Sequence, residues 1–434
     1  MKKFMKFLIG SIIIVTLAFI IFKFTSKYNL DVIYNNIDWS IDVKGYEGAK
    51  SFHYDEDGNL YIAFKDSIRI INSNGKDELI IRENDFDILD IICSNNRLFI
   101  ATDNRVIEYD IEKHEGTNLI KDIPNTGINK ETKLLIRDNI LYVSIGTNTN
   151  SGIVNKKGEA YDKPTISLIL RGINYGENKT GIFSPFAVNT EKGEKVKEGK
   201  LGNGSVMAYD FESKNTSIYS HGLKNINGWD IDSDGKIKAI VGGMEDVGER
   251  PIKDDKDYIY ELKKNAWYGW PDYSGGDPIT SPRFTDDKKV EFLIENHPNK
   301  IPSAPIYQHT DVSSLKGFAI DSEGEFFLKD TMVFSDNKEG FLYALTNDGI
   351  LNELIDLGDK SQIEKIKFYN NSFYVLDSKL GCLYNLQPKD QSGIFNLPIE
   401  VWLFVVSLLI VLLVCGIFKF NKKDNLGNIN IKNR

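Results

Sequence analysis

The chain has 434 residues, with 53 basic and 62 acidic side chains and a formal net charge of −9. Its length exceeds that of one small domain, and its acidic balance excludes the basic surface that nucleic-acid binding requires. Its three cysteines do not have the spacing of metal ligands.

An uncharged apolar run spans residues 7–22, with lysines before and after it. A membrane-spanning helix needs about 20 apolar residues, a length that the run approaches when Phe4, Met5 and Phe24 are added. A cleaved signal peptide is the alternative, although residues 23–27 contain no small-x-small cleavage pattern. We expect residues 1–27 to be a membrane anchor, with a signal peptide left open.

A polar turn rich in Asp, Asn and Gly recurs along the middle of the chain, each time followed by an alternating apolar strand. Such turns supply the positive-φ positions of tight hairpins, and the alternation is typical of half-buried strands. The turns begin at Asp55, Ser94, Arg137, Asp232, Asp321 and Tyr369. This recurrence predicts an all-β fold, a six-bladed β-propeller over residues 28–397. An irregular β-sandwich is the alternative.

Two details of this propeller stay open in the sequence. Residues 28–45 and 387–398 are either tethers or strands that close the ring. Cys93 and Cys382 lie in strand-like stretches, where they form either a disulfide or two small buried side chains.

Two motifs flank an acidic loop between residues 221 and 278. They read Gly-Leu-Lys-Asn at 222–225 and Trp-Tyr-Gly-Trp-Pro at 267–271. This order resembles the glucose/sorbosone dehydrogenase family, the soluble quinoprotein sugar dehydrogenases, in which the motifs read Gly-Leu-Arg-Asn and Asn-Tyr-Gly-Trp-Pro. The resemblance covers about residues 120–345. It implies a six-bladed propeller that oxidises a sugar at its anomeric carbon with pyrroloquinoline quinone (PQQ) and calcium.

The catalytic base of the family is missing from its expected place. The resemblance implies a His-x-Gly-Gly motif just before the third-blade strand, yet residues 127–133 contain no His. Glu131 is a candidate base there, since a base has to reach the substrate hydroxyl; a solvated loop residue is the alternative. His309 lies in a segment similar to a family segment rich in Ser, His and Gly. It is the better candidate for a surviving acid-base group, and a structural histidine is the alternative.

The cofactor clamp is changed as well. Lys224 and Asn225 match the Arg-Asn pair of the family, but Lys keeps the charge without the bidentate fork. The family also uses arginines late in the propeller, whereas this chain has none between Arg283 and Arg434. Lys316 and Lys329 are the candidates to replace them, and we expect a cofactor with three carboxylates to be poorly held.

The acidic loop is the candidate metal site. Asp257 matches the Asp of an Asp-Glu pair in the family's calcium site, while Tyr258 replaces the Glu. Asp254, Asp255 and Asp257 would supply some of the roughly six to eight oxygens that calcium requires. A solvated run of charges is the alternative.

The aromatic residues of the closing motif are candidates for contact with a substrate. Trp267, Tyr268 and Trp270 would stack on the face of a sugar. Packing between blades is the alternative.

A second uncharged apolar run spans residues 401–418 and is followed by Lys419, Lys422 and Lys423. We expect a transmembrane helix at residues 398–419 and a basic cytoplasmic tail at 420–434. Positive charge outside both runs places both termini in the cytoplasm and the propeller on the extracellular side of the cell membrane. The lysines before the first run and the tail carry +3 and +4, which leaves about −16 on the exported part. Such a charge suits a neutral substrate or a cation.

Two functions remain open, so the sequence does not decide whether the protein is an enzyme. The first is an exofacial propeller that binds a sugar or a cell-envelope polymer, its catalytic base lost. The second is a PQQ-dependent aldose dehydrogenase, which Asn225, the Tyr-Gly-Trp-Pro loop and export favour. The missing His and the missing arginines favour binding. A purely structural envelope component is a third interpretation, for which no specific feature speaks.

Overall fold

The computed structural model describes residues 30–284 and 289–389, together with single positions between residues 10 and 28. The chain divides into one unit of Leu30–Pro388 and another of Met1–Asn29 with Lys389–Arg434. The second apolar run, and all but four positions of the first, lie outside the described residues. In the part of the chain that is described, no helix has the length and apolarity to span a bilayer. Both anchors and the boundaries at residues 27 and 397 therefore stay predictions.

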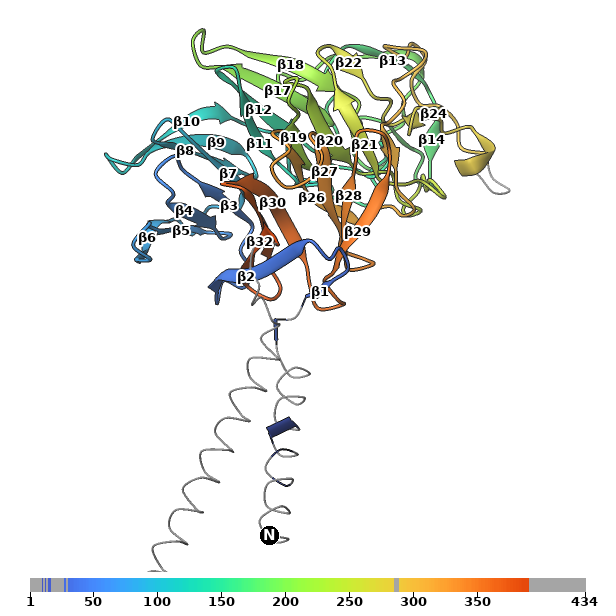
Figure 1. Ribbon diagram of the computed structural model, residues 1–434. Helices are drawn as coiled ribbons and strands as arrows, with labels where there is room; N and C mark the ends of the chain where they lie inside the picture. Colours follow the sequence, from blue (N-terminus) through green and yellow to red (C-terminus); the bar gives the residue numbers. More distant parts are fainter. Residues whose placement is uncertain are drawn as a thin grey trace, which may run out of the picture. The chain divides into compact units, whose positions relative to one another are not determined.

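The unit Leu30–Pro388 is a six-bladed β-propeller, as the sequence predicts (Figure 1). Blade 1 comprises β3 (Ser51–Tyr54), β4 (Leu60–Ala63), β5 (Ser67–Ile71) and β6 (Asp77–Arg82), and blade 2 comprises β7 (Ile88–Ser94), β8 (Arg97–Thr102), β9 (Arg105–Asp110) and β10 (Glu115–Lys121). Blade 3 comprises β11 (Leu134–Arg137), β12 (Ile140–Ile145), β17 (Ser205–Asp210), β18 (Thr216–His221) and β22 (Ala266–Trp267). The first strands of all six blades line one central cavity, which places them at the centre of the ring.

The other three blades continue the ring. Blade 4 comprises β19 (Ile226–Ile231), β20 (Ile237–Val241), β21 (Tyr258–Leu262) and β25 (Tyr307–Gln308). Blade 5 comprises β26 (Leu315–Asp321), β27 (Thr331–Asp336), β28 (Phe341–Leu345), β29 (Leu351–Asp356) and β1 (Asp31–Val32). Blade 6 comprises β30 (Ile363–Tyr369), β31 (Ser372–Asp377), β32 (Cys382–Pro388) and β2 (Ile37–Lys44).

The ring closes within blade 6. The N-terminal strand β2 pairs antiparallel with the last strand, β32, from Ile37 opposite Pro388 to Lys44 opposite Cys382. Figure 1 shows the blue β2 beside the orange-red blade 6. Residues 37–44 are thus a closing strand rather than a tether. Cys382 on β32 and Cys93 on β7 are buried and form no disulfide.

The predicted hairpin turns explain why the strands begin and end where they do. Asn95 and Asn96 have φ of 50° and 60°, and Asn370 and Asn371 have φ of 48° and 58°, as tight turns between two strands require. Gly58, Gly235 and Gly324 hold the corresponding positive φ in the Asp-rich turns. These turns all follow a first strand and therefore lie at one end of the propeller, the turn end. The opposite end, where first strands begin, is the mouth end.

Two long insertions account for the wide spacing of the middle repeats. Residues 146–204 and 263–306 carry β13 (Leu168–Arg171), β14 (Asn174–Tyr175), β15 (Thr180–Gly181), β16 (Lys192–Val196), β23 (Tyr273–Ser274), β24 (Asp277–Pro278) and the 3₁₀ turn η1 (Pro282–Phe284). Much of their apolar surface is buried in a cluster around Leu170, Trp270 and Phe284. Arg250 joins them, because its guanidinium donates to the carbonyls of Ser151, Pro271 and Glu291 and to the Asp272 carboxylate at 2.8–3.0 Å.

Candidate functional site

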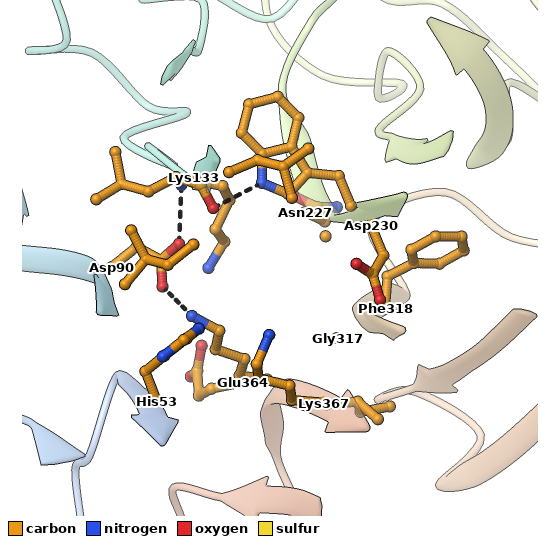
Figure 2. A pocket seen from close by; sticks show the side chains of 16 residues that line it. His53, Asp90, Lys133, Asn227, Asp230, Gly317, Phe318, Glu364 and Lys367 are labelled. Atoms are coloured by element: carbon orange, nitrogen blue, oxygen red, sulfur yellow. Dashed lines mark hydrogen bonds and ion pairs between the residues drawn. The ribbon is translucent and has the colours of Figure 1, made fainter. Parts of the chain in front are cut away.

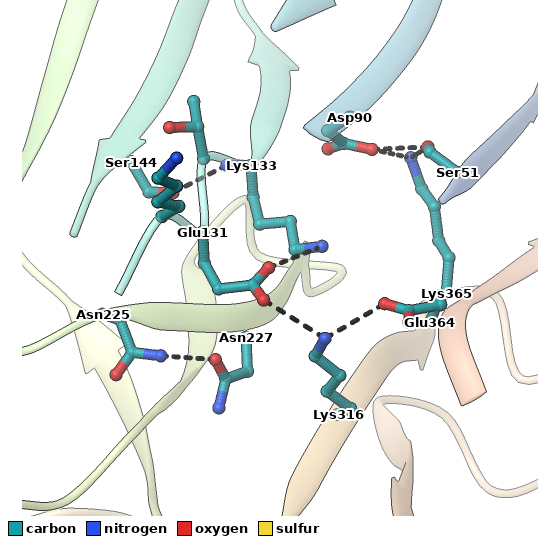
Figure 3. A network of polar contacts seen from close by, with 12 residues as sticks. Ser51, Asp90, Glu131, Lys133, Ser144, Asn225, Asn227, Lys316, Glu364 and Lys365 are labelled. Carbon is teal, nitrogen blue, oxygen red and sulfur yellow. Dashed lines mark hydrogen bonds and ion pairs between the residues drawn. The ribbon is translucent and has the colours of Figure 1, made fainter. Parts of the chain in front are cut away.

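A network of charged side chains crosses the mouth end of the propeller (Figure 3). Lys316, on β26, places its Nζ 3.2 Å from Oε1 of Glu131 and 3.0 Å from Oε2 of Glu364 on β30. Lys133 lies 3.4 Å from the other oxygen of Glu131. The network therefore joins blades 3, 5 and 6 across the centre.

These contacts decide the protonation of Glu131. Burial acts to raise the pKa of this carboxyl, but Lys133 and Lys316 lower the pKa to about 2. In return, the two glutamates raise the pKa of Lys316 against the effect of burial. An efficient general base has a pKa near the working pH, so a carboxylate held at this pKa is a weak base at neutral pH.

A second ion pair lies beside this network. Nζ of Lys365 on β30 is 2.7 Å from Oδ1 of Asp90 on β7, and it donates to Ser51 and to the carbonyl of Ile91 at 3.0 Å. The other oxygen of Asp90 accepts the amide of Leu134 at 2.9 Å. Sequence reasoning missed Asp90, Glu364 and Lys365, because they lie on strands without a motif. Asp90 has one signal, a charged residue inside an apolar strand, whereas Glu364 and Lys365 lie in a strand with three charged residues.

The predicted clamp residues Lys224 and Asn225 also lie at the mouth end, but both point into the protein. Lys224 is 4 % exposed, and its Nζ donates to the carbonyl of Gly243 at 2.6 Å and lies 4.0 Å from Glu245. Burial lowers the pKa of Lys224. Asn225 donates to Asn227 at 2.5 Å, while its own Oδ1 is buried without a hydrogen-bond partner.

Lys329 is not brought together with the other clamp candidates. It is exposed in the loop between β26 and β27, whose neighbouring residue Asp330 accepts hydrogen bonds from Ser233 at 2.7 Å. Ser233 lies in the turn that follows β19, whereas Asn225 directly precedes this strand. Lys329 therefore lies at the turn end, one strand length away from the mouth.

The candidate calcium ligands are engaged by the protein itself. Asp257 accepts the backbone amides of Gly243 and Ser313 at Oδ1 and those of Ser314 and Leu315 at Oδ2, at 2.8–3.2 Å.

Asp255 is engaged in the same way as Asp257. It accepts the hydroxyls of Tyr258 and Ser274 and the amides of Met244 and Lys256. Asp254 is exposed. Within residues 30–284 and 289–389, no group of three or more His, Cys, Asp and Glu side chains is arranged to hold a metal. These residues do not fit the calcium ion that the resemblance implies.

His309 uses both ring nitrogens for contacts within the protein. Nε2 lies 2.7 Å from Oδ2 of Asp336 and Nδ1 lies 3.0 Å from the hydroxyl of Tyr307. Burial acts to raise the pKa of Asp336, but hydrogen bonds from His309 and from backbone amides lower it. His309 is 3 % exposed, so the geometry is that of a structural histidine tied to a carboxylate.

The three aromatic candidates pack inside the protein. Trp267 stacks on His297 with ring centroids 5.5 Å apart, and Tyr268 donates to the carbonyl of Glu261 at 2.7 Å. Trp270 donates to the carbonyl of Asn150 at 3.0 Å. All three are buried, so none of them presents an open ring face to a sugar.

The mouth does not fit the cofactor either. PQQ is held through its carboxylates, which call for cations with free donors. Here Lys316 and Lys365 each face a carboxylate, and Lys224 donates to a carbonyl. Lys133 keeps spare donors, but it too lies beside a carboxylate, that of Glu131. One orphaned polar atom at the mouth, Oδ1 of Asn225, is an acceptor and would repel a carboxylate. The acidic neighbours of Lys316 are carboxylates of the chain itself, Glu131 and Glu364.

Comparison with known proteins identifies the fold. No family model matches the chain, and no curated protein matches it. Among solved structures, a Trichoderma reesei carbohydrate-active enzyme of family AA12 is 13% identical and superposes with a TM-score of 0.59 over 83% of this chain and 98% of the other. The holo pyranose dehydrogenase PQQ domain from Coprinopsis cinerea is also 13% identical, with a TM-score of 0.57 over 83% and 98%.

A third solved structure is the PQQ-bound aldose sugar dehydrogenase from Streptomyces coelicolor. It is 12% identical to this chain, with a TM-score of 0.52 over 81% of this chain and 98% of the other. At these identities the likeness is one of fold. The chain therefore has the six-bladed fold of the glucose/sorbosone dehydrogenase-like propellers, as its motifs predict.

Proposed function

We propose that this chain is a membrane-anchored propeller of the glucose/sorbosone dehydrogenase type, which binds a sugar or a sugar-containing cell-envelope ligand outside the cell without oxidising it. One observation carries the proposal. At the mouth, Glu131 and Glu364 already neutralise Lys316, one of the lysines that would have to replace the family's late arginines.

The candidate acid-base groups support the same proposal. Oxidation of a sugar hydroxyl needs a base with a free lone pair within reach of the proton. Glu131 is a weak base because two lysines lower its pKa to about 2. His309 has both nitrogens engaged by Tyr307 and Asp336. Neither side chain is free to accept a substrate proton.

A groove at the turn end offers room for a ligand. Its volume is about 840 Å³, within the range of small-molecule sites, and it lies between blades 2 and 3. Phe211 packs against Phe99 with ring centroids 5.2 Å apart, and Arg97, Glu108 and Asn139 add polar groups to the lining. Apolar rings suit the C–H face of a sugar, and the polar groups suit its hydroxyls.

The location of the ligand follows from the anchors proposed for residues 1–27 and 398–419. Both apolar runs have lysines on their outer side, which favours cytoplasmic termini. The acidic propeller would then lie outside the cell, where its negative charge favours neutral glycans over acidic ones.

Glycan binding tests the positive part of the proposal. The full chain in detergent should bind a neutral glycan on an array, and Phe211→Ala should weaken that binding at least about tenfold, the loss expected for an aromatic anchor. Phe341→Ala, a half-buried aromatic of blade 5, is the matched control and should bind as the wild type does. Absence of binding to every neutral glycan would refute the ligand class.

A dye-reduction assay separates this function from the second candidate, a PQQ-dependent aldose dehydrogenase. The PQQ-bound structures of similar fold favour that candidate. The full chain is incubated with PQQ and calcium, and dye reduction is followed with a panel of aldoses. We expect no turnover above the rate without protein. Sugar-dependent dye reduction that requires both PQQ and the protein would establish the enzyme instead.

A further inference from the structure

A small cavity lies at the centre of the ring, below the mouth network (Figure 2). Its volume is about 50 Å³, room for one small ion or a few waters, since one water needs roughly 10–15 Å³ in this measure. The first strand of every blade contributes to its lining. Six charged side chains face it: Asp90, Lys133, Asp230, Glu364, Lys365 and Lys367.

His53, on β3, directs an unpaired donor toward this cavity. The amide of Cys93 donates to Nδ1 of His53 at 3.3 Å, so Nδ1 is the acceptor and Nε2 carries the hydrogen of the neutral ring. Nε2 is buried and has no hydrogen-bond partner, and the residue is only 7 % exposed. Burial, Lys367 and Lys365 all keep the pKa of His53 well below its usual range, which keeps the ring neutral. An orphaned buried donor of this kind calls for an acceptor.

Lys367 is a second donor with nothing to donate to. Lys367 is half-buried, and within residues 30–284 and 289–389 its ammonium group makes no hydrogen bond and no ion pair. Its charge acts to lower the pKa of Asp230 against the effect of burial. Lys133 adds spare donors, because its Nζ has one carboxylate neighbour, Glu131 at 3.4 Å. Figure 2 shows His53, Lys133 and Lys367 around the same open space.

The acidic groups of the lining are already engaged. Asp90 is bound by Lys365, Ser51 and the Leu134 amide. Asp230 accepts the amides of Ile231 and Ile320 at 2.9 Å.

Glu364, the remaining acid of the lining, pairs with Lys316. The cavity is therefore short of acceptors rather than donors.

We propose that this cavity binds a small monovalent inorganic anion, such as chloride, which accepts hydrogen bonds from Nε2 of His53 and Nζ of Lys367. His53 belongs to blade 1 and Lys367 to blade 6, and their strands β3 and β30 are in contact. The anion would join blade 1 to blade 6, the blade in which β2 closes the ring. This proposal is independent of the ligand and of the activity discussed above.

Anion-dependent thermal unfolding tests the proposal. The full chain in detergent is unfolded at constant ionic strength while chloride replaces gluconate, an anion too large for the cavity. We expect the unfolding midpoint to rise with chloride and to saturate, because a ligand that binds only the folded state stabilises it by mass action. Equal midpoints in the two salts would mean that water alone fills the cavity, and would overturn the proposal.

Two variants separate a bound ion from a general salt effect. Lys367→Met and His53→Phe should each abolish the saturable chloride response, whereas Lys329→Met, an exposed lysine at the turn end, should keep it. If His53→Phe does not fold, the chloride response of Lys367→Met alone tests the proposal. Retention of the full response in Lys367→Met would refute the site. In crystals soaked with bromide, we expect anomalous density within hydrogen-bond distance of Nε2 of His53; density only elsewhere would also refute it.

Discussion

Replacement of Asp257 by Asn separates the structural role of this carboxylate from a role as a calcium ligand. Asp257 is fully buried, and its two oxygens each accept two backbone amides, from Gly243, Ser313, Ser314 and Leu315. Asn has the same shape but one oxygen and one NH₂ group. Whichever way the amide faces, two backbone N–H groups lose their acceptor and meet another donor.

The expected cost of Asp257→Asn follows from those two lost contacts. A hydrogen bond to a charged group contributes about 1.5–3 kcal/mol, so the free energy of unfolding should fall by about 3–6 kcal/mol. That loss is a large part of the roughly 5–15 kcal/mol by which domains are stable. Urea unfolding of the full chain in detergent, followed by tryptophan fluorescence, measures it in the presence of either a calcium chelator or calcium.

Asp254→Asn is the matched control for this experiment. Asp254 is exposed and has a φ of 50°, a conformation that Asn also adopts readily. The free energy of unfolding of the Asp254→Asn variant should stay within about 0.5 kcal/mol of the wild-type value. The reasoning is refuted if Asp257→Asn costs less than about 1 kcal/mol. It is also refuted if calcium stabilises the wild type and this stabilisation is lost in Asp257→Asn.

Three further predictions concern other parts of the chain. Burial lowers the pKa of His221 to about 4, so the unfolded chain binds a proton that the folded chain does not. Stability should therefore fall by about 3 kcal/mol between pH 6.5 and 4, and urea unfolding of His221→Gln should lack that slope; an unchanged slope would contradict it. Arg250→Lys should lower the free energy of unfolding by roughly 3–5 kcal/mol, because Lys cannot reach four acceptors from a buried position; a urea midpoint equal to that of wild type would rule this out. In a bacterial host, alkaline phosphatase fused after residue 397 should be active and after residue 434 inactive; activity at both positions would exclude the proposed topology.

The local part of the fold could be predicted from the sequence because it is encoded in short segments. Asn95-Asn96 and Asn370-Asn371 adopt the positive φ values that tight hairpins need. The strands beside them show the alternating pattern of apolar residues that is typical of half-buried strands. The closing strand was only one of two alternatives for residues 28–45. Its partner, β32, lies more than 300 residues further along the chain, and no local pattern specifies such a pairing.

For the candidate site, motif comparison could predict single residues but not how their side chains pair. Motif comparison brought Glu131, Lys224 and Asn225 to attention, and the structure places them at one end of the propeller. It could not give the charge pairing, since Lys316 meets carboxylates from two other blades. Lys329 is close to Lys316 in sequence but is separated from it by the length of β26.

The sequence also could not show which groups donate hydrogen bonds to the buried carboxylate of Asp257. Asp257 was a candidate metal ligand because it matches the Asp of the Asp-Glu pair in the acidic loop of the resembled family. Three of its four amide donors come from residues 313–315, where the chain enters the next blade. The acidic loop around Asp257 does not reveal whether its carboxylate binds amides or calcium, because the amide donors come from a distant segment.

Calorimetric titration of the full chain with PQQ, in the presence of calcium, tests the central claim that the mouth is neutralised by the protein's own carboxylates. We predict no saturable binding to the wild type. The double variant Glu131→Gln/Glu364→Gln, which removes both acidic neighbours of Lys316, should gain measurable affinity for PQQ, provided that circular dichroism shows it folded. Micromolar binding to the wild type, unchanged or weakened in the double variant, would contradict the claim.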